Sequence, residues 1–299
     1  MSDSTAPALE LRKLGLSFGG LRAVHDVSLA LPTGALHGLI GPNGAGKTTI
    51  FNLLTGVYRP DVGEIRLGGR TISRPGAGEG TSGELAGALG RLAAGRIRIG
   101  LGGRGAGLRP SQIARAGMAR TFQNIRLFGE LSVLDNVCIA AGTRARAGLW
   151  QSLVRTPMAQ AEERCIRARS RELLDVLGIG HRAGEQAKSL PYGDQRRLEI
   201  ARALATEPKV LLLDEPVAGM NSSEKHAMRA LIQQLRTDFG VAILLIEHDM
   251  GLVMDICEHI TVLDHGEVIA AGAPSAIQAD PAVIAAYLGV PDDEAEGVS

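Results

Sequence analysis

Short apolar runs alternate with helix-like segments over much of the 299-residue chain. Runs rich in Val, Ile and Leu cover residues 35–40, 210–214, 241–246 and 260–264, and a segment of helical character follows each of the first three. This alternation is typical of parallel strands joined by crossover helices. The pattern therefore predicts an α/β fold with a mainly parallel sheet.

Two segments before this core have a different pattern. Residues 9–18 and 24–31 are predicted to be edge or antiparallel strands, and in the second one Val27, Leu29 and Leu31 alternate with smaller residues. Such alternation is expected when only one face of a sheet is buried. We expect a small antiparallel β-layer ahead of the parallel core.

From Ser132 to Gly178 the periodicity turns helical, beginning with Ser132 and Asp135 at capping-box spacing. This block predicts a helical insertion into the core. Near the C-terminus, Asp280 and Pro281 have the residue types of an N-cap and a first helical position. They predict a last helix, followed by an acidic tail that we expect to be disordered.

Together these patterns divide the chain into several parts. They are the β-layer with the first part of the core (9–73 and 108–131), an insertion rich in Gly, Ala and Arg (74–107), a helical subdomain (132–205), the rest of the core (206–289) and flexible tails (1–8 and 290–299). Loops as long as the insertion are uncommon inside compact domains. We interpret it as a surface excursion; the alternative is that Arg96, Arg98 and Arg104 contact a partner.

Charge and cysteine content limit the possible environments. Lys+Arg and Asp+Glu both total 32, so no broad basic field indicates nucleic acid as a partner. Cys138, Cys165 and Cys257 form neither a disulfide framework nor a metal motif, which fits a reducing compartment. The N-terminus has no signal pattern, and the longest apolar runs fall short of the roughly 20 residues that span a bilayer. We expect a cytosolic chain whose membrane role, if any, comes through a partner.

The stretch "GPNGAGKT", residues 41–48, matches the pattern G-x-x-x-x-G-K-[ST] between a predicted strand and a predicted helix. Glycines let the backbone wrap phosphates, and N–H groups with the helix dipole supply positive potential. Lys47 would reach the β- and γ-phosphates, and Thr48 would ligate Mg²⁺. This stretch predicts a nucleoside triphosphate site.

A second motif, "VLLLDEP" at residues 210–216, is a buried-strand run that ends in two carboxylates. Two adjacent negative charges in a buried position destabilise the folded chain unless a bound cation or a proton neutralises them. Asp214 would hold Mg²⁺. Adjacent side chains of a strand point to opposite sides, so Glu215 would reach a different place and polarise an attacking water as general base.

Three further residues are weak signals when each is taken alone. His248 follows a strand-like run and would hydrogen-bond a γ-phosphate or the attacking water; the alternative is a helix-cap histidine. Phe18 would stack on a base, in a chain that is only 3% aromatic; the alternative is a core residue. Gln123 offers an amide to Mg²⁺ or to water.

The stretch "SLPYGDQRRLEIARAL", residues 189–204, has a Pro-Tyr-Gly break, an acid and two arginines before a helix. The chain resembles ATP-binding-cassette (ABC) ATPases from about residue 9 to 289. The resemblance lies in the order of the motifs along the chain: Phe18, residues 41–48, Gln123, this stretch, the Asp-Glu strand and His248. The resemblance implies a P-loop NTPase fold and ATP hydrolysis.

Several residue roles follow from this resemblance. ATP-binding residues would be Phe18 together with Gly41, Pro42, Asn43, Gly44, Ala45, Gly46, Lys47, Thr48 and Thr49. Catalytic residues would be Glu215, His248 and Gln123, and Mg²⁺ ligands would be Thr48, Gln123 and Asp214.

The resemblance also implies pairing of two cassettes. Residues Leu190, Pro191, Tyr192, Gly193 and Asp194 match the signature loop, usually Leu-Ser-Gly-Gly-Gln, which covers the ATP held by a second cassette. Pro191 removes a hydroxyl and an N–H from that loop. Asp194 adds a negative charge, which should weaken phosphate affinity unless Arg196 or Arg197 compensates.

Within the family, the sequence is most similar to those of the ATP-binding subunits of branched-chain amino-acid importers. The stretches concerned are "ARTFQNIRLF", "LPYGDQRRLEIARALA", "LLLDEPVAGMN", "LIEHDMGLVMDIC" and "AAYLG". This resemblance implies a peripheral ATPase at the cytoplasmic face of the membrane that drives two membrane-spanning permeases fed by an extracytoplasmic binding protein. The helical block would receive the permeases, and the loop at 219–221 would cross to the second cassette.

Other functions stay open at this point. Related ATPases energise urea and short-amide importers, and the cassette never contacts the solute. An ABC ATPase acting on nucleic acid and a small-molecule kinase are further alternatives. ABC ATPases that act on nucleic acid usually carry coiled-coil or zinc-bearing insertions, and this sequence indicates neither. A small-molecule kinase would leave the signature stretch and His248 unexplained. Whether the two cassettes are identical or different is not indicated by the sequence.

Overall fold

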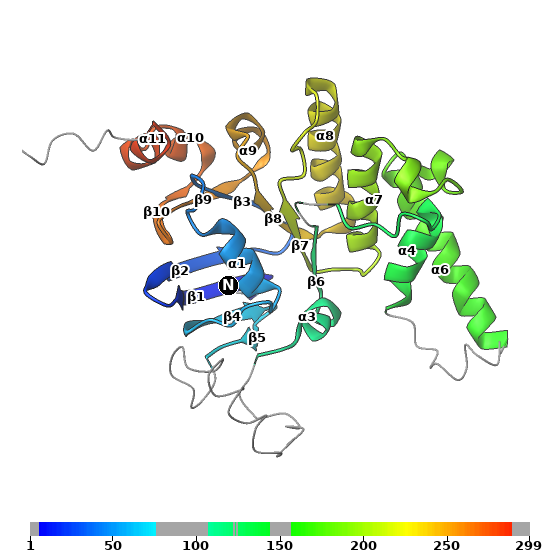
Figure 1. Cartoon of the computed structure of the whole chain (residues 1–299), viewed down its shortest axis with the longest axis horizontal. Helices are drawn as coiled ribbons and strands as arrows, with labels where there is room; N and C mark the ends of the chain where they lie inside the picture. The colour runs from blue at the N-terminus through cyan, green and yellow to red at the C-terminus, as the bar shows by residue number, and fades with distance from the viewer. Residues whose placement is uncertain (1–5, 76–106, 122, 124, 144–156, 289–299) are drawn as a thin grey trace, which may run out of the picture.

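The computed structural model describes residues 6–75, 107–121, 123, 125–143 and 157–288, coloured in Figure 1. Residues 76–106 lie outside the described residues, and with them most of the expected insertion and its arginines Arg96, Arg98 and Arg104. The same holds for the expected tails, apart from residues 6–8.

The helices and strands follow the alternation expected from the sequence (Figure 1). The strands are β1 (Leu9–Phe18), β2 (Leu21–Leu31), β3 (Leu36–Ile40), β4 (Val62–Leu67), β5 (Arg70–Ser73), β6 (Met118–Arg120), β7 (Val210–Asp214), β8 (Ala242–Ile246), β9 (His259–Asp264) and β10 (Glu267–Gly272). The helices are α1 (Lys47–Leu54), α3 (Pro110–Ala116), α4 (Val133–Gly142), α6 (Pro157–Val176), α7 (Tyr192–Leu204), α8 (Ser222–Phe239), α9 (Met250–Ile256), α10 (Pro274–Gln278) and α11 (Pro281–Leu288), with 3-10 turns η1 (Gly180–Arg182) and η2 (Ala187–Ser189).

A six-stranded sheet in the order β10-β9-β3-β8-β7-β6 forms the core. Its strands run parallel except for β10, which pairs antiparallel with β9. Ile246 pairs with Leu39 on one side and with Asp214 on the other. The carboxyl ends of β3, β8 and β7 therefore lie at the same level, and the loops that follow these strands meet at one edge of the sheet.

Both faces of this sheet are covered, which explains why its strands are continuous apolar runs. On one face, Leu39, Leu212 and Leu244 pack with α1 and with the four-stranded antiparallel sheet β2-β1-β4-β5. On the other face, Leu213 and Leu245 pack with α8, α9 and the helical block. The expected antiparallel layer is confirmed.

Helices α4, α6 and α7 form the helical block at one end of the molecule (Figure 1). The predicted cap of α4 is present, because the Ser132 hydroxyl accepts a hydrogen bond from the Asp135 N–H at 3.0 Å. The predicted cap of α11 is present too, with Asp280 Oδ1 accepting from the Ala282 N–H at 2.8 Å. Among the described residues, no helix combines the length and the hydrophobicity that a bilayer crossing needs.

Two strands of the core were not anticipated from the sequence. The edge strand β6 has only three residues and ends in Arg120, and β10 is exposed along part of its length. Neither segment is long or apolar enough to give a strand signal of its own. β6 matters for function, because it leads from the sheet directly to Gln123.

Candidate nucleotide-binding and hydrolysis site

The phosphate loop connects β3 to α1 and fits tightly against its surroundings. A Cβ atom at Gly41 would lie 2.0 Å from the Leu263 carbonyl oxygen, and one at Gly46 would lie 2.6 Å from the Ala23 carbonyl oxygen. At Gly44 a Cβ would meet nothing within 4 Å, but φ is +84° there. Packing therefore requires two of the glycines, and left-handed backbone favours the third.

Lys47 is the first residue of α1 and folds back onto the loop. Its Nζ donates to the carbonyl oxygens of Gly41, at 2.6 Å, and Pro42, at 2.8 Å. Burial lowers the pKa of the Lys47 ammonium, and the charges of Glu215 and Asp214 oppose this shift. The ammonium is thus held at the loop by neutral acceptors, which phosphate oxygens can replace.

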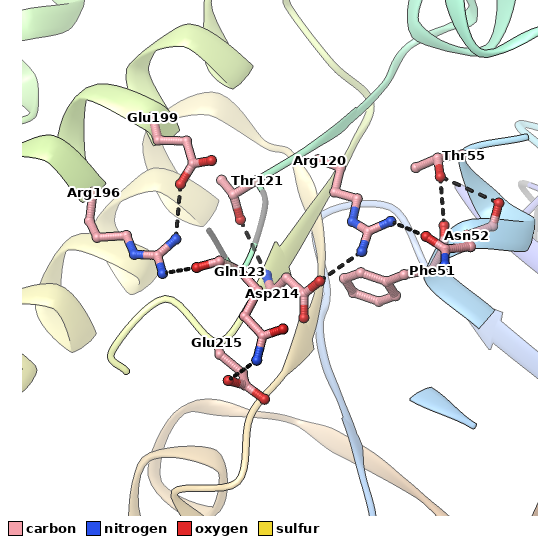
Figure 2. A network of polar contacts seen from close by, with 10 residues as sticks. All are labelled: Phe51, Asn52, Thr55, Arg120, Thr121, Gln123, Arg196, Glu199, Asp214 and Glu215. Atoms are coloured by element: carbon pink, nitrogen blue, oxygen red, sulfur yellow. Dashed lines mark hydrogen bonds and ion pairs between the residues drawn. The ribbon is translucent and has the colours of Figure 1, made fainter. Parts of the chain in front are cut away.

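Asp214, at the end of β7, is buried and bound to an arginine that the sequence did not single out. Arg120 Nη2 lies 2.8 Å from Asp214 Oδ2, and Arg120 Nη1 donates to Asn52 Oδ1 at 2.8 Å (Figure 2). The guanidinium carbon lies 5.3 Å from the centre of the Phe51 ring. Arg120 therefore connects β6, β7 and α1, and it orients one oxygen of the Asp214 carboxylate.

Glu215 points into the site for a reason other than the expected one. The two carboxylates do reach different places, but strand alternation is not the reason, because β7 ends at Asp214 and Glu215 has a left-handed backbone with φ +48°. Its N–H donates to the Ile246 carbonyl oxygen at 2.9 Å. A non-glycine residue in this conformation is uncommon and is often found at functional sites.

The structure brings the three expected catalytic residues together. Gln123 Nε2 donates to Glu215 Oε2 at 3.1 Å, and His248 Nδ1 lies 3.5 Å from Glu215 Oε1. The His248 side chain is 62% exposed, so it is free to reach a ligand. Its alternative role as a helix cap is wrong, because Asp249 caps α9 by accepting from the Leu252 N–H.

Phe18 lies at the end of β1 and is 45% exposed, which excludes the alternative of a core residue. Its ring contacts Tyr58 edge to face, with the ring centres 5.2 Å apart. Sequence reasoning missed Tyr58. The aromatic content of the chain offered a signal, since the sequence holds only three tyrosines.

The predicted signature loop overlaps the start of α7: Pro191 is the N-cap residue, and Tyr192, Gly193 and Asp194 form the first turn of the helix. The sequence left open whether Arg196 or Arg197 compensates the charge of Asp194. In the structure Asp194 is paired with Arg182, whose Nε lies 3.2 Å from Asp194 Oδ2, while Arg197 donates to the Leu177 carbonyl oxygen.

Figure 1 shows α7 within the helical block and away from α1. The start of α7 therefore lies apart from this chain's own phosphate loop.

The residues expected at Mg²⁺ fit this ion chemically. Thr48 is exposed beside the phosphate loop, and Asp214 supplies a carboxylate. The described residues contain no group of three or more His, Cys, Asp or Glu that could hold a metal ion. Mg²⁺ is usually bound through one or two carboxylates together with substrate phosphates, and Asp214 is one such carboxylate.

Comparisons with known proteins point to one family. The ABC transporter family model matches residues 24–218, and a model described as branched-chain amino acid ATP-binding cassette transporter matches residues 267–293. The branched-chain amino acid transport ATP-binding protein LivG of Salmonella typhimurium is 42% identical over 95% of this chain and 98% of its own length. The corresponding protein BraF of Pseudomonas aeruginosa is 40% identical over the same shares.

Solved structures agree in fold. The ADP conformation of MJ1267, an ATP-binding cassette of an ABC transporter, superposes with a TM-score of 0.73 at 26% identity, covering 96% of this chain and all of that one. A nucleotide-free ATP-binding cassette gives a TM-score of 0.72 at 25% identity, with coverage of 95% and 99%. Since the similarity to LivG and to these cassettes extends over nearly the whole chain, this protein belongs to the ABC transporter family, as an ATP-binding cassette.

Proposed function

We propose that this chain is the ATP-hydrolysing subunit of an importer for branched-chain amino acids. The observation that carries the proposal is the contact of Glu215 with Gln123 and His248, at the sheet edge that also presents Lys47 and Asp214. Hydrolysis needs a carboxylate there besides the one that binds Mg²⁺, because a base must accept the proton of the attacking water. The names of the relatives LivG and BraF support the choice of solute.

In this proposal the phosphate loop and Lys47 hold the β- and γ-phosphates, and Phe18 stacks on the base. Thr48, Asp214 and Gln123 hold Mg²⁺, which neutralises phosphate charge when it is bound. Glu215 accepts a proton from the attacking water, whose oxygen forms the new bond to the γ-phosphorus while the bond to the β–γ bridging oxygen breaks.

His248 donates a hydrogen bond to the γ-phosphate in the same step. Its exposed position beside Glu215 supports this role, because an imidazole that is not enclosed by protein can turn toward a ligand.

The proposed assembly has a second cassette, identical or related, whose ATP is covered by the signature loop Leu190, Pro191, Tyr192, Gly193 and Asp194. Two membrane permeases would dock on the helical block at the cytoplasmic face of the membrane, and an extracytoplasmic binding protein would deliver solute to them. Exposure of Pro191 and Tyr192 supports a contact in trans. The balanced charge of the chain supports a role without nucleic acid.

An uptake experiment in the source cell tests the function and the solute together. Deletion of the gene should abolish high-affinity uptake of radiolabelled leucine and leave urea uptake unchanged. Wild-type protein should restore leucine uptake, and the Glu215→Gln variant should not, because it lacks the general base. Loss of urea uptake with normal leucine uptake would favour the amide importer instead, and no transport defect at all would contradict the proposal.

A further inference from the structure

A buried ion pair lies on α7, directly after the signature loop. Arg196 Nη1 lies 3.0 Å from Glu199 Oε2, and the two side chains are only 3% and 5% exposed. Buried ion pairs contribute little to stability compared with well-packed apolar residues, because both charges lose their hydration. The pair therefore needs an explanation other than holding α7 in the fold.

The Arg196 guanidinium also extends in two other directions. Its Nη2 donates to the main-chain oxygen of Gln123, and both Nη2 and Nε lie within hydrogen-bond distance of the Tyr192 hydroxyl, at 3.0 and 3.2 Å. The guanidinium carbon lies 5.5 Å from the centre of the Tyr192 ring. Arg196 thus joins Tyr192 of the signature loop to the backbone of Gln123. Figure 2 shows the part of this connection that runs from Arg196 through Gln123 to Glu215.

The Tyr192 ring extends the connection one step further. It packs against Gly219, where an added Cβ would lie 3.6 Å from Tyr192 Cε1, and Gly219 is in the loop between β7 and α8. Glu215 starts that same loop. A closed path of contacts therefore runs from Glu215 through Gln123, Arg196 and Tyr192 and back to the loop that carries Glu215.

We propose that Arg196, held by Glu199, is a positioning residue that fixes Gln123 against Glu215 and couples this arrangement to the signature loop. The inference deepens the proposed function and depends on it for its kinetic consequences. Its physical basis is that the planar guanidinium donates in fixed directions, so one buried side chain sets the relative position of three segments. In consequence, the state of this chain's own ATP site would affect the loop that it presents to the second cassette.

The test replaces the pair by apolar residues in the full-length chain, as Arg196→Met with Glu199→Met. Replacing both avoids leaving a buried charge without its partner. The control is Arg197→Met, a neighbour on α7 whose guanidinium donates to the Leu177 carbonyl oxygen inside the helical block. We expect the double variant to bind MgATP with unchanged affinity and to lose about ten- to a hundredfold in kcat, as misplacement of a catalytic group does. The control should keep the wild-type kcat.

A double-mutant cycle separates positioning from general structural damage. If Arg196 acts through Gln123, then the double variant should cause no further loss of kcat in a Gln123→Ala background. Independent, multiplicative losses would overturn the proposal, and so would a double variant with wild-type kcat.

Hydrogen exchange gives a readout that does not depend on catalysis. Amides around Gln123 should exchange faster in the double variant and not in the Arg197→Met control. Unchanged exchange there would refute the inference itself. Absence of ATP hydrolysis by the wild-type protein, with faster exchange in the double variant, would instead count against the proposed function.

Discussion

At the scale of single residues, the hydrolytic site depends on where a strand stops. β7 ends at Asp214, and the left-handed backbone of Glu215 turns its side chain toward Gln123 and His248. Asp214 stays in the sheet with its carboxylate bound to Arg120. Two adjacent carboxylates thereby obtain different environments, as the proposed division between Mg²⁺ binding and general base requires.

Asp194 gives a residue-level prediction for the signature loop. In Asp194→Gln, we expect ATPase activity to be kept or raised, with a KM for ATP that is unchanged or lowered by up to about fivefold. One unit charge removed from the neighbourhood of a phosphate is worth about 1 kcal/mol at high dielectric. The measurement is steady-state hydrolysis against ATP concentration.

The control for Asp194 is Glu185→Gln, which removes the other carboxylate bound to Arg182, at 3.2 Å, from outside the signature loop. Its KM should equal that of the wild type. Both ion pairs of Arg182 are partly exposed, so neither substitution should cost more than about 1 kcal/mol of stability. Complete loss of activity in Asp194→Gln would show that the acid itself is required.

At the scale of elements, the parallel strands are held by apolar packing on both faces, with one buried polar contact between β3 and β9. His37 Nε2 lies 2.8 Å from Thr261 Oγ1, and the His37 ring packs edge to face on His259. Burial, with a smaller effect of the His259 charge, lowers the pKa of His37 to about 4. The folded core therefore requires a neutral His37.

The low pKa of His37 predicts a pH-dependent stability. Below its unfolded pKa of about 6.5, the unfolded chain takes up a proton that the folded chain does not. The contribution of neutral His37 to the free energy of unfolding is thus fully present above about pH 6.5. It is lost as the pH falls toward 4, by up to about 3 kcal/mol. Urea denaturation between pH 4 and 7 measures this loss, when the wild type is compared with a double variant that carries His37→Val and Thr261→Val. The same pH dependence in both proteins would contradict the prediction.

At the scale of the whole molecule, the cassette is a core that holds ATP and a helical block that presents a signature loop. Figure 1 shows the two at different places in the molecule, and β6 is the edge strand of the core on the side of the helical block. In the proposed assembly, a single chain would supply two different halves of an ATP site, and a second cassette would complete each half.

Trapping the paired state is a prediction for the whole molecule. Glu215→Gln should keep ATP affinity, lose at least about a hundredfold in turnover, and elute as a dimer with MgATP in size-exclusion chromatography. The control is Glu258→Gln, which should turn over ATP normally. Glu258 is a half-exposed carboxylate paired with Arg236, and it lies just before the amino end of β9, whereas the site is at the carboxyl ends of the parallel strands. Wild-type turnover in Glu215→Gln would exclude Glu215 as the base, and a monomer that retains ATP would indicate that the partner is a different cassette.

Features that depend on neighbours along the chain were determined by the sequence alone. The apolar runs of β3, β7 and β8, the phosphate loop at 41–48 and the cap at Ser132 follow from local spacing, and the structure has each of them where it was expected. The order of the motifs was sufficient to indicate the family that the comparisons then showed.

Tertiary structure alone decided which charges meet. Arg120 and Asp214 are 94 positions apart, and the sequence holds 32 basic and 32 acidic residues, so no spacing rule selects this pair. The same is true of Arg182 with Asp194 and of Arg196 with the backbone of Gln123. Contacts of this kind arise only when the sheet and the helical block pack together, because packing determines which polar groups lose water and must find a partner.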